Sequence, residues 1–137
     1  MIEALEATWL AEHLRRSRWT YPLVNAGHIL GIALLLGALV PMHLRRLRGL
    51  DPLVPVLRPH AIAGLALAVG CGAPLFLTRA GEYLGNPWFQ LKLALLAVAL
   101  THAAWHLRAE GIPARAAVAS LTLWLAVLVA GRMIAFA

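Results

Sequence analysis

Histidine is the residue type in this sequence with the widest chemical scope, because a neutral imidazole binds both metal ions and haem iron. The chain holds six histidines in 137 residues: His13, His28, His43, His60, His102 and His106. Two cationic side chains, Lys92 and Arg132, also stand inside apolar runs. Ionisable residues in such runs indicate a functional site by default. The chemistry on offer is ligation of a metal or haem, and binding of an anionic group.

Composition places these residues in a membrane protein. Hydrophobic residues make up 61% of the chain and charged residues 13%, with a mean hydropathy of +0.77. Soluble domains have about 45–50% and about 25%, respectively. The net charge of +6 does not indicate nucleic-acid binding, because the arginines flank apolar runs as membrane anchors do. The single cysteine, Cys71, excludes a disulfide within the chain and a zinc site of several thiolates.

The apolar runs predict an all-α fold, an integral membrane antiparallel four-helix bundle. Each span needs roughly 20 apolar residues, and the predicted spans are 22–44, 60–77, 88–107 and 116–136. Residues 1–20 predict an amphipathic helix lying in the membrane interface. Pro41 is expected to bend or end the first span. The proline-rich linker 49–59 is expected to be extended rather than helical.

Small residues recur at four-residue spacing in the first two spans. The pairs are Gly27/Gly31, Ala33/Gly37, Ala66/Gly70 and Ala68/Gly72. Because lipid gives helices no hydrophobic reason to associate, such pairs mark surfaces where backbones approach closely. The first two spans are therefore predicted to pack tightly together.

Four histidines are predicted to meet at the linker end of the bundle. At about 1.5 Å of rise per residue, His43, His60 and His106 lie within about 2 Å of one plane, with His102 about 8 Å deep. His102 and His106 are one helical turn apart and share a face. Three helices would thus deliver four imidazoles to one end.

A second group is predicted near the opposite surface. His28, Lys92 and Arg132 fall at depths of roughly 24, 22 and 25 Å, with Asn25 slightly shallower. Cations that share such a depth predict an anionic partner: a carboxylate, a phosphate headgroup, a haem propionate or a reduced quinone. His28 and His43 lie within roughly 60° of one helix face, as in membrane cytochromes that hold two haems.

Each group has a simpler interpretation. Imidazoles at helix ends can bond water, headgroups or free carbonyls without any cofactor. Lys92 and Arg132 can extend their long stems toward the membrane surface. Both interpretations stay open at the level of sequence.

Three segments resemble a family of small four-span bacterial inner-membrane proteins of unassigned function: YPLVNAGHILG at 21–31, EYLGNPWFQLK at 82–92, and WH at 105–106. More distantly, the chain is similar to the copper-resistance D-type domain and related haem-b membrane bundles. These resemblances imply a four-helix membrane bundle and, on the second, bis-imidazole iron. The positions that match the first pattern are Asn25, His28, Asn86, Lys92 and His106.

The leading hypothesis is a membrane protein that binds haem b and transfers electrons, with quinone or another redox membrane protein as partner. Axial ligands would come from His60, His102 or His106 together with His43. His28 would serve a second haem, with Lys92 and Arg132 neutralising its propionates.

Two other classes stay open. One is a copper-handling protein whose metal ligands are His43, His60, His102 and His106, although Cu(I) prefers softer ligands than imidazole. The other is a cofactor-free structural or assembly subunit that contacts lipids or a partner. No hydrolytic arrangement of Ser, His and acid is visible, so no catalytic residue is assigned.

Location and assembly follow from charge and resemblance. The expected location is the bacterial inner membrane. Six arginines on the linker side against four on the other favour both longer linkers in the cytoplasm and the termini outside it. A homodimer remains an alternative to the single chain.

Overall fold

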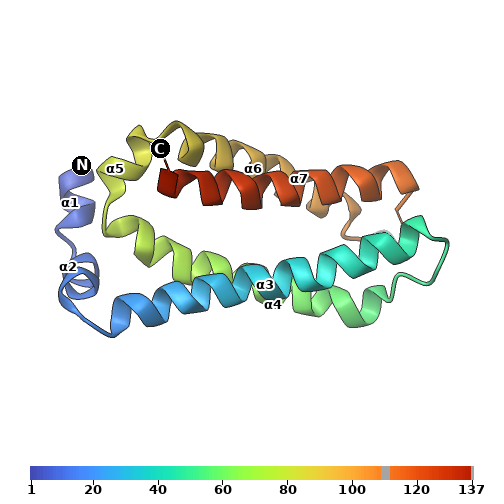
Figure 1. Cartoon of the computed structure of the whole chain (residues 1–137), viewed down its shortest axis with the longest axis horizontal. Helices are drawn as coiled ribbons and strands as arrows, with labels where there is room; N and C mark the ends of the chain where they lie inside the picture. Colours follow the sequence, from blue (N-terminus) through green and yellow to red (C-terminus); the bar gives the residue numbers. More distant parts are fainter. Residues whose placement is uncertain (109–111, 137) are drawn as a thin grey trace. The chain divides into compact units, whose positions relative to one another are not determined.

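A computed structural model describes residues 1–108 and 112–136, and this described part is helical without strands (Figure 1). Its elements are α1 Ile2–Glu6, α2 Trp9–Arg16, α3 Thr20–Leu47, α4 Val54–Leu77, α5 Ala80–Gly85, α6 Pro87–His106, α7 Ala114–Met133 and the 3₁₀ turn η1 Ile134–Phe136. The predicted class, an all-α four-helix bundle, is confirmed.

Within the described residues, four helices are long and apolar enough to cross a membrane: Thr20–Leu47, Val54–Leu77, Pro87–His106 and Ala114–Phe136. Twenty residues rise about 30 Å, the thickness of the hydrocarbon core. Only 6% to 22% of the most apolar window of each helix is buried inside the protein. Exposed apolar surface on this scale needs lipid around it. The chain is a multi-pass membrane protein.

Two helix boundaries differ from the sequence prediction. Helix α3 continues through Pro41 to Leu47, and α4 begins at Val54, so that Pro55 and Pro59 are helical. Pro55 stands in the first turn of α4, where the missing N–H has no intrahelical partner in any case. The extended linker is therefore shorter than predicted. It turns at Gly49, whose φ is 69°.

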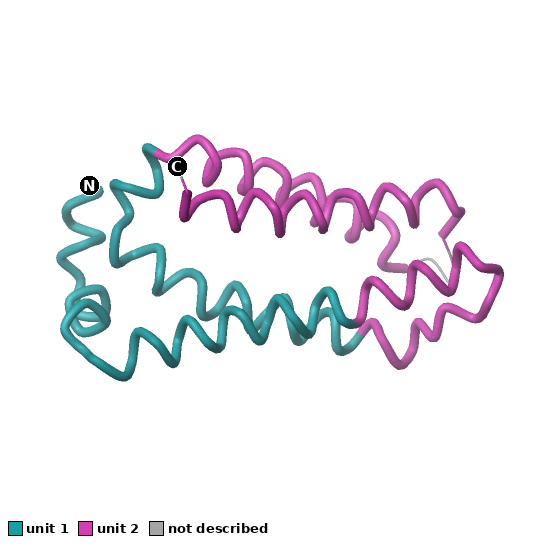
Figure 2. Tube along the Cα trace, viewed as in Figure 1, with its two compact units in different colours: residues 1–37, 59–85 teal, residues 38–58, 86–137 magenta. Residues whose placement is uncertain are grey.

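The chain divides into two compact units (Figure 2). Unit 1 comprises residues 1–37 and 59–85, and unit 2 comprises residues 38–58 and 86–137. Each unit contains a pair of apolar helical segments that pack on each other, so each can be described by itself.

In unit 1, α3 and α4 pack through glycine, as predicted. A Cβ added to Gly31 would lie 2.7 Å from the carbonyl oxygen of Gly64, and one added to Gly64 would lie 2.5 Å from the backbone nitrogen of Leu35. A Cβ on Gly27 would lie 2.8 Å from Sγ of Cys71. Because residue numbers rise along α3 as their partners fall along α4, the two helices are antiparallel.

Not every small residue of the predicted pairs serves this contact. A Cβ added to Gly37 or Gly70 would meet nothing within 4 Å, and both residues are exposed. Gly64, which the predicted pairs omit, lies at the close approach together with Ala68, which they include. Position on the helix face, rather than spacing alone, decides which glycine is used.

The first residues of unit 1 form two short helices instead of the single helix predicted. Thr8 is extended between them, and its side chain accepts a hydrogen bond from the backbone N–H of Ala11 at 3.4 Å. Threonine favours such an N-cap position over a helix interior. Leu14 is 1% exposed, so α2 packs firmly within the unit.

In unit 2, α6 and α7 pack along a buried stripe of α7. Its members recur every three or four residues, as one face of a helix requires: Ala117, Ser120, Trp124, Val127 and Ala130. Asn86 caps α6 and donates through Nδ2 to the carbonyl of Ile134 at 3.3 Å. The Nε of Arg46 donates to the carbonyl of Ile112 at 2.7 Å.

Candidate functional site

His43 is the unusual buried side chain of unit 2. It lies four residues from the end of α3 and is 5% exposed. Its Nε2 is buried and has no hydrogen-bond partner among the described residues. An unsatisfied buried polar atom costs about 1–3 kcal/mol. His43 Nε2 is therefore the buried polar atom of unit 2 whose cost the described residues do not offset.

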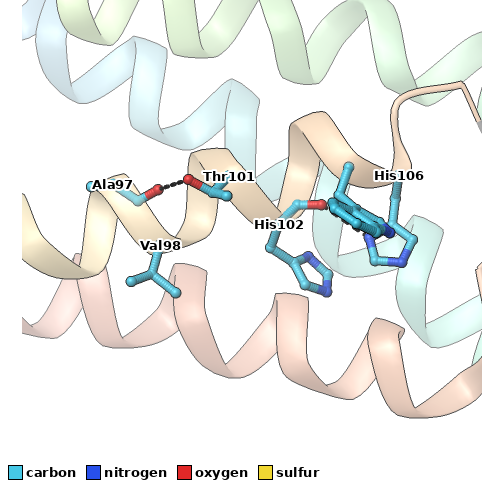
Figure 3. A pocket seen from close by; sticks show the side chains of 6 residues that line it. Ala97, Val98, Thr101, His102 and His106 are labelled. Atoms are coloured by element: carbon cyan, nitrogen blue, oxygen red, sulfur yellow. Dashed lines mark hydrogen bonds between the residues drawn. The ribbon is translucent and has the colours of Figure 1, made fainter.

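His102 of α6 lies in the same compact unit as His43. It is half-buried, and its ring lies 4.5 Å from the ring of His106, tilted by 45°. The Nδ1 of His106 donates to the main-chain carbonyl of His102 at 2.9 Å. With Nδ1 carrying the proton, Nε2 of His106 is left with a lone pair. Figure 3 shows the His102 and His106 rings side by side on α6.

A hollow of about 420 Å³ adjoins these two rings. Its lining comes from one face of α6 (Figure 3): Ala97, Val98, Thr101, His102, Trp105 and His106. The hydroxyl of Thr101 is occupied, because it donates to the carbonyl of Ala97 at 2.8 Å. The hollow is thus a largely apolar surface that carries two imidazoles and one indole.

The predicted linker-end cluster is brought together in part. His43, His102 and His106 belong to unit 2, whereas His60 lies on the exposed surface of α4 in unit 1. Within residues 1–108 and 112–136, no three His, Cys, Asp or Glu side chains are placed to hold one metal ion. The four histidines therefore do not form a closed metal cage.

His28 takes part in the α3–α4 contact of unit 1. Its Nδ1 donates to the carbonyl of Ala68 at 2.6 Å, and a Cβ on Gly72 would lie 3.0 Å from the ring. The absence of a side chain at Gly72 makes room for the imidazole. Nε2 keeps its lone pair, because the carbonyl fixes the tautomer. Asn25, one turn earlier, is exposed.

Lys92 and Arg132 both belong to unit 2. A Cβ on Gly131 would lie 3.5 Å from Nζ of Lys92, so the lysine stem lies against the residue that precedes Arg132 in α7. The Arg132 guanidinium lies 4.9 Å from the centre of the Phe136 ring. Sequence reasoning found the two cations but not Gly131 or Phe136, whose roles depend on which helix faces meet.

Three titratable groups outside the spans lie in or directly before the short helix α5. Arg79 pairs with Glu82 at 3.3 Å, and both side chains are largely exposed. Tyr83 is half-buried. Burial, and then the neighbouring Tyr21, raise the pKa of the Tyr83 phenol, so the neutral form is favoured in the folded protein.

These features define an all-α, multi-pass membrane protein with unsatisfied imidazole in one helical unit. Comparison of the chain with family models, with curated proteins and with solved structures finds no match. The resemblances drawn from the sequence therefore remain predictions, and function has to be argued from the site itself.

Proposed function

We propose that unit 2 binds haem b through His43 and His102 and that the protein transfers electrons within the membrane. The observation that carries the proposal is the buried Nε2 of His43, which has no hydrogen-bond partner among the described residues. His102 of α6 belongs to the same compact unit. Axial ligands on opposite faces of a haem normally come from different helices. His43 on α3 and His102 on α6 satisfy that condition, whereas His102 and His106 share a helix.

The number of available ligands favours haem over a bare metal ion. A structural zinc ion takes four protein ligands and a catalytic one three, and the described residues offer no group of three. Haem iron already has four ring nitrogens and needs only one or two axial side chains. Two imidazoles from two helices therefore suit haem better than the copper alternative. No observation on this chain specifically favours copper.

The residues of unit 2 have separate tasks under this proposal. Bound haem would supply a one-electron couple between its ferric and ferrous states. His43 and His102 would hold the iron, and Val98 and Trp105 would supply apolar surface beside His102. His106, bonded through Nδ1 to the carbonyl of His102, would position the neighbouring turn.

Absorbance of the protein purified in mild detergent, after expression with haem precursor, tests the proposal. The expected preparation is red, with a Soret band that shifts on dithionite reduction. His43→Ala and His102→Ala should each abolish or strongly weaken the band. His13→Ala, which changes a histidine of α2 in unit 1, is the control and should retain it.

The alternatives give different results. A colourless protein with stoichiometric copper would support the copper-handling class, and a colourless, metal-free protein would support a structural or assembly subunit. Retention of the band in His43→Ala and His102→Ala would refute the ligand assignment. Loss of the band in His60→Ala would move the site toward α4.

We further propose that the protein resides in the bacterial inner membrane with its termini outside the cytoplasm, and that quinone or a second redox membrane protein exchanges electrons with it. The arginine distribution supports the orientation. Reporter fusions at the carboxyl end test it, since alkaline phosphatase should be active there and green fluorescent protein dark. Cross-linking in membranes would separate a homodimer from a single chain.

A further inference from the structure

Two cationic side chains, Lys92 and Arg132, lie near one end of unit 2 and have no part in the proposed haem ligation by His43 and His102. Lys92 is the sixth residue of α6 and Arg132 the penultimate residue of α7, so both stand close to the end of an antiparallel pair. No carboxylate of residues 1–108 or 112–136 forms an ion pair with either side chain. Two uncompensated cations at the end of a membrane helix pair call for an anion.

The Lys92 side chain packs against Gly131. Its Cδ, Cε and Nζ atoms would lie 3.4–3.5 Å from a Cβ added to Gly131, which is ordinary contact distance. Helical side chains lean toward the N-terminus of their helix. For Lys92 this is the Pro87 end, about 7.5 Å away along the axis. The lysine stem and its ammonium group therefore lie against α7 at Gly131, and a stem of this length can extend toward the membrane surface in a bilayer.

Arg132 is held at the same end by an aromatic ring. Its guanidinium carbon lies 4.9 Å from the centre of the Phe136 ring, within the range of a cation–π contact. Such a contact leaves the N–H groups at the edge of the guanidinium plane available to an oxyanion. The guanidinium is thus oriented without being neutralised.

The backbone N–H groups at the start of α6 cannot bind the anion in place of Lys92 and Arg132. Asn86 Oδ1 already accepts from the N–H groups of Trp88 and Phe89, at 2.9 and 3.3 Å. Its Nδ2 donates to the carbonyl of Ile134. The first amides of α6 are therefore occupied, and an anion at this end would be bound by the ammonium and guanidinium groups.

We propose that Lys92 and Arg132 bind the phosphate of an anionic phospholipid headgroup at this end of the α6–α7 pair. Phosphate is the anion that a bilayer presents at the ends of its spanning helices, and basic sites between helices bind such headgroups. A guanidinium adds paired hydrogen bonds to the point charge of an ammonium. The proposal is independent of haem binding by His43 and His102.

Native mass spectrometry of the detergent-purified chain, with phosphatidylglycerol or phosphatidylcholine added at equal concentration, tests the proposal. The wild type should retain phosphatidylglycerol preferentially. Each basic residue near an anionic surface contributes about fivefold in affinity, so Lys92→Gln and Arg132→Gln should each lower retention about fivefold and the double variant roughly 25-fold. Lys92→Arg should keep most of the binding.

Arg16→Gln is the matched control. Arg16 already pairs with Glu12 at 2.6 Å and lies outside the spans, so its loss should leave lipid retention unchanged. Size-exclusion profiles and thermal unfolding of each variant separate lost binding from lost folding. A folded double variant that retains phosphatidylglycerol like the wild type would overturn the proposal, as would equal retention of the two lipids.

Two further arms identify the source of the anion. Millimolar inorganic phosphate should not displace the lipid; complete displacement would show a free-phosphate site instead. Retention should also be the same in preparations with and without added haem precursor. Loss of lipid from haem-loaded protein alone would assign both cations to haem propionates and refute the lipid site.

Discussion

Replacing Gly31 by alanine should weaken the α3–α4 pair of unit 1. The new methyl carbon would meet the carbonyl oxygen of Gly64 at 2.7 Å and the Cα of Ala68 at 2.8 Å, and it would also meet the backbone nitrogen of Ala68. Carbon contacts are favourable near 3.5–4.0 Å. Because all three neighbours are backbone atoms, no rotamer change relieves the overlap, and the helices must move apart by roughly 0.7–1 Å.

The expected cost is set by overpacking. Extra carbon in a packed contact costs about 1–3 kcal/mol, whereas alanine in place of glycine gains about 0.8–1 kcal/mol in helix propensity. Gly37→Ala on the same helix gains the propensity and meets nothing within 4 Å. The difference in unfolding free energy between the two variants therefore isolates the contact, at about 1–3 kcal/mol.

Thermal unfolding in detergent, followed by circular dichroism, measures this difference. Gly31→Ala should melt roughly 3–10 °C below Gly37→Ala. Gly27→Ala should fall between them, since the atom it meets, Sγ of Cys71, can rotate away. If Gly31→Ala and Gly37→Ala melt together, the close backbone approach of α3 and α4 is wrong.

Two smaller predictions concern the polar ends of the helices. Asn86→Ala removes the cap of α6 and should cost about 1 kcal/mol, whereas Asn86→Asp keeps the accepting oxygen and should cost less; equal melting temperatures for the two variants would contradict the cap. Burial raises the pKa of Tyr83, so the unfolded chain ionises first as pH rises through about 10, and stability is lost above that pH. Tyr83→Phe should lose less stability than the wild type between pH 9 and 11, and identical pH profiles would show that the phenol makes no contribution.

Helix identity and depth could be predicted from sequence because both follow from the length of apolar runs and a fixed rise per residue. The shared level of Lys92 and Arg132 is an example. The start of α4 could not be predicted, because prolines that disfavour a helix interior are tolerated in a first turn. Pro55 therefore looked like linker and is helical.

Side-chain partners depend on helix rotation, which spacing leaves undetermined. The sequence placed His43 and His102 at the linker end of the bundle but gave no sign that Nε2 of His43 would be buried with no hydrogen-bond partner among the described residues. The sequence also gave Gly31, Gly37 and Gly70 the same role, although of these three glycines only Gly31 contacts the other helix. Because helix rotation is undetermined, the hydrogen bond between His28 and the carbonyl of Ala68 could not be predicted either.

The guanidinium of Arg15 links three segments of unit 1 through hydrogen bonds. Arg15 of α2 donates to the carbonyl of Glu6 at the end of α1, at 2.7 Å, and to that of Thr78 just beyond α4, at 3.2 Å. The Glu6 carboxylate in turn accepts from the N–H of Gly81 in α5. Loss of any one of these hydrogen bonds weakens the others, so the first eighteen residues should separate from α4 and α5 as one cooperative unit. A protein that binds and displaces α1 would therefore also disturb the chain at Thr78, where α4 ends.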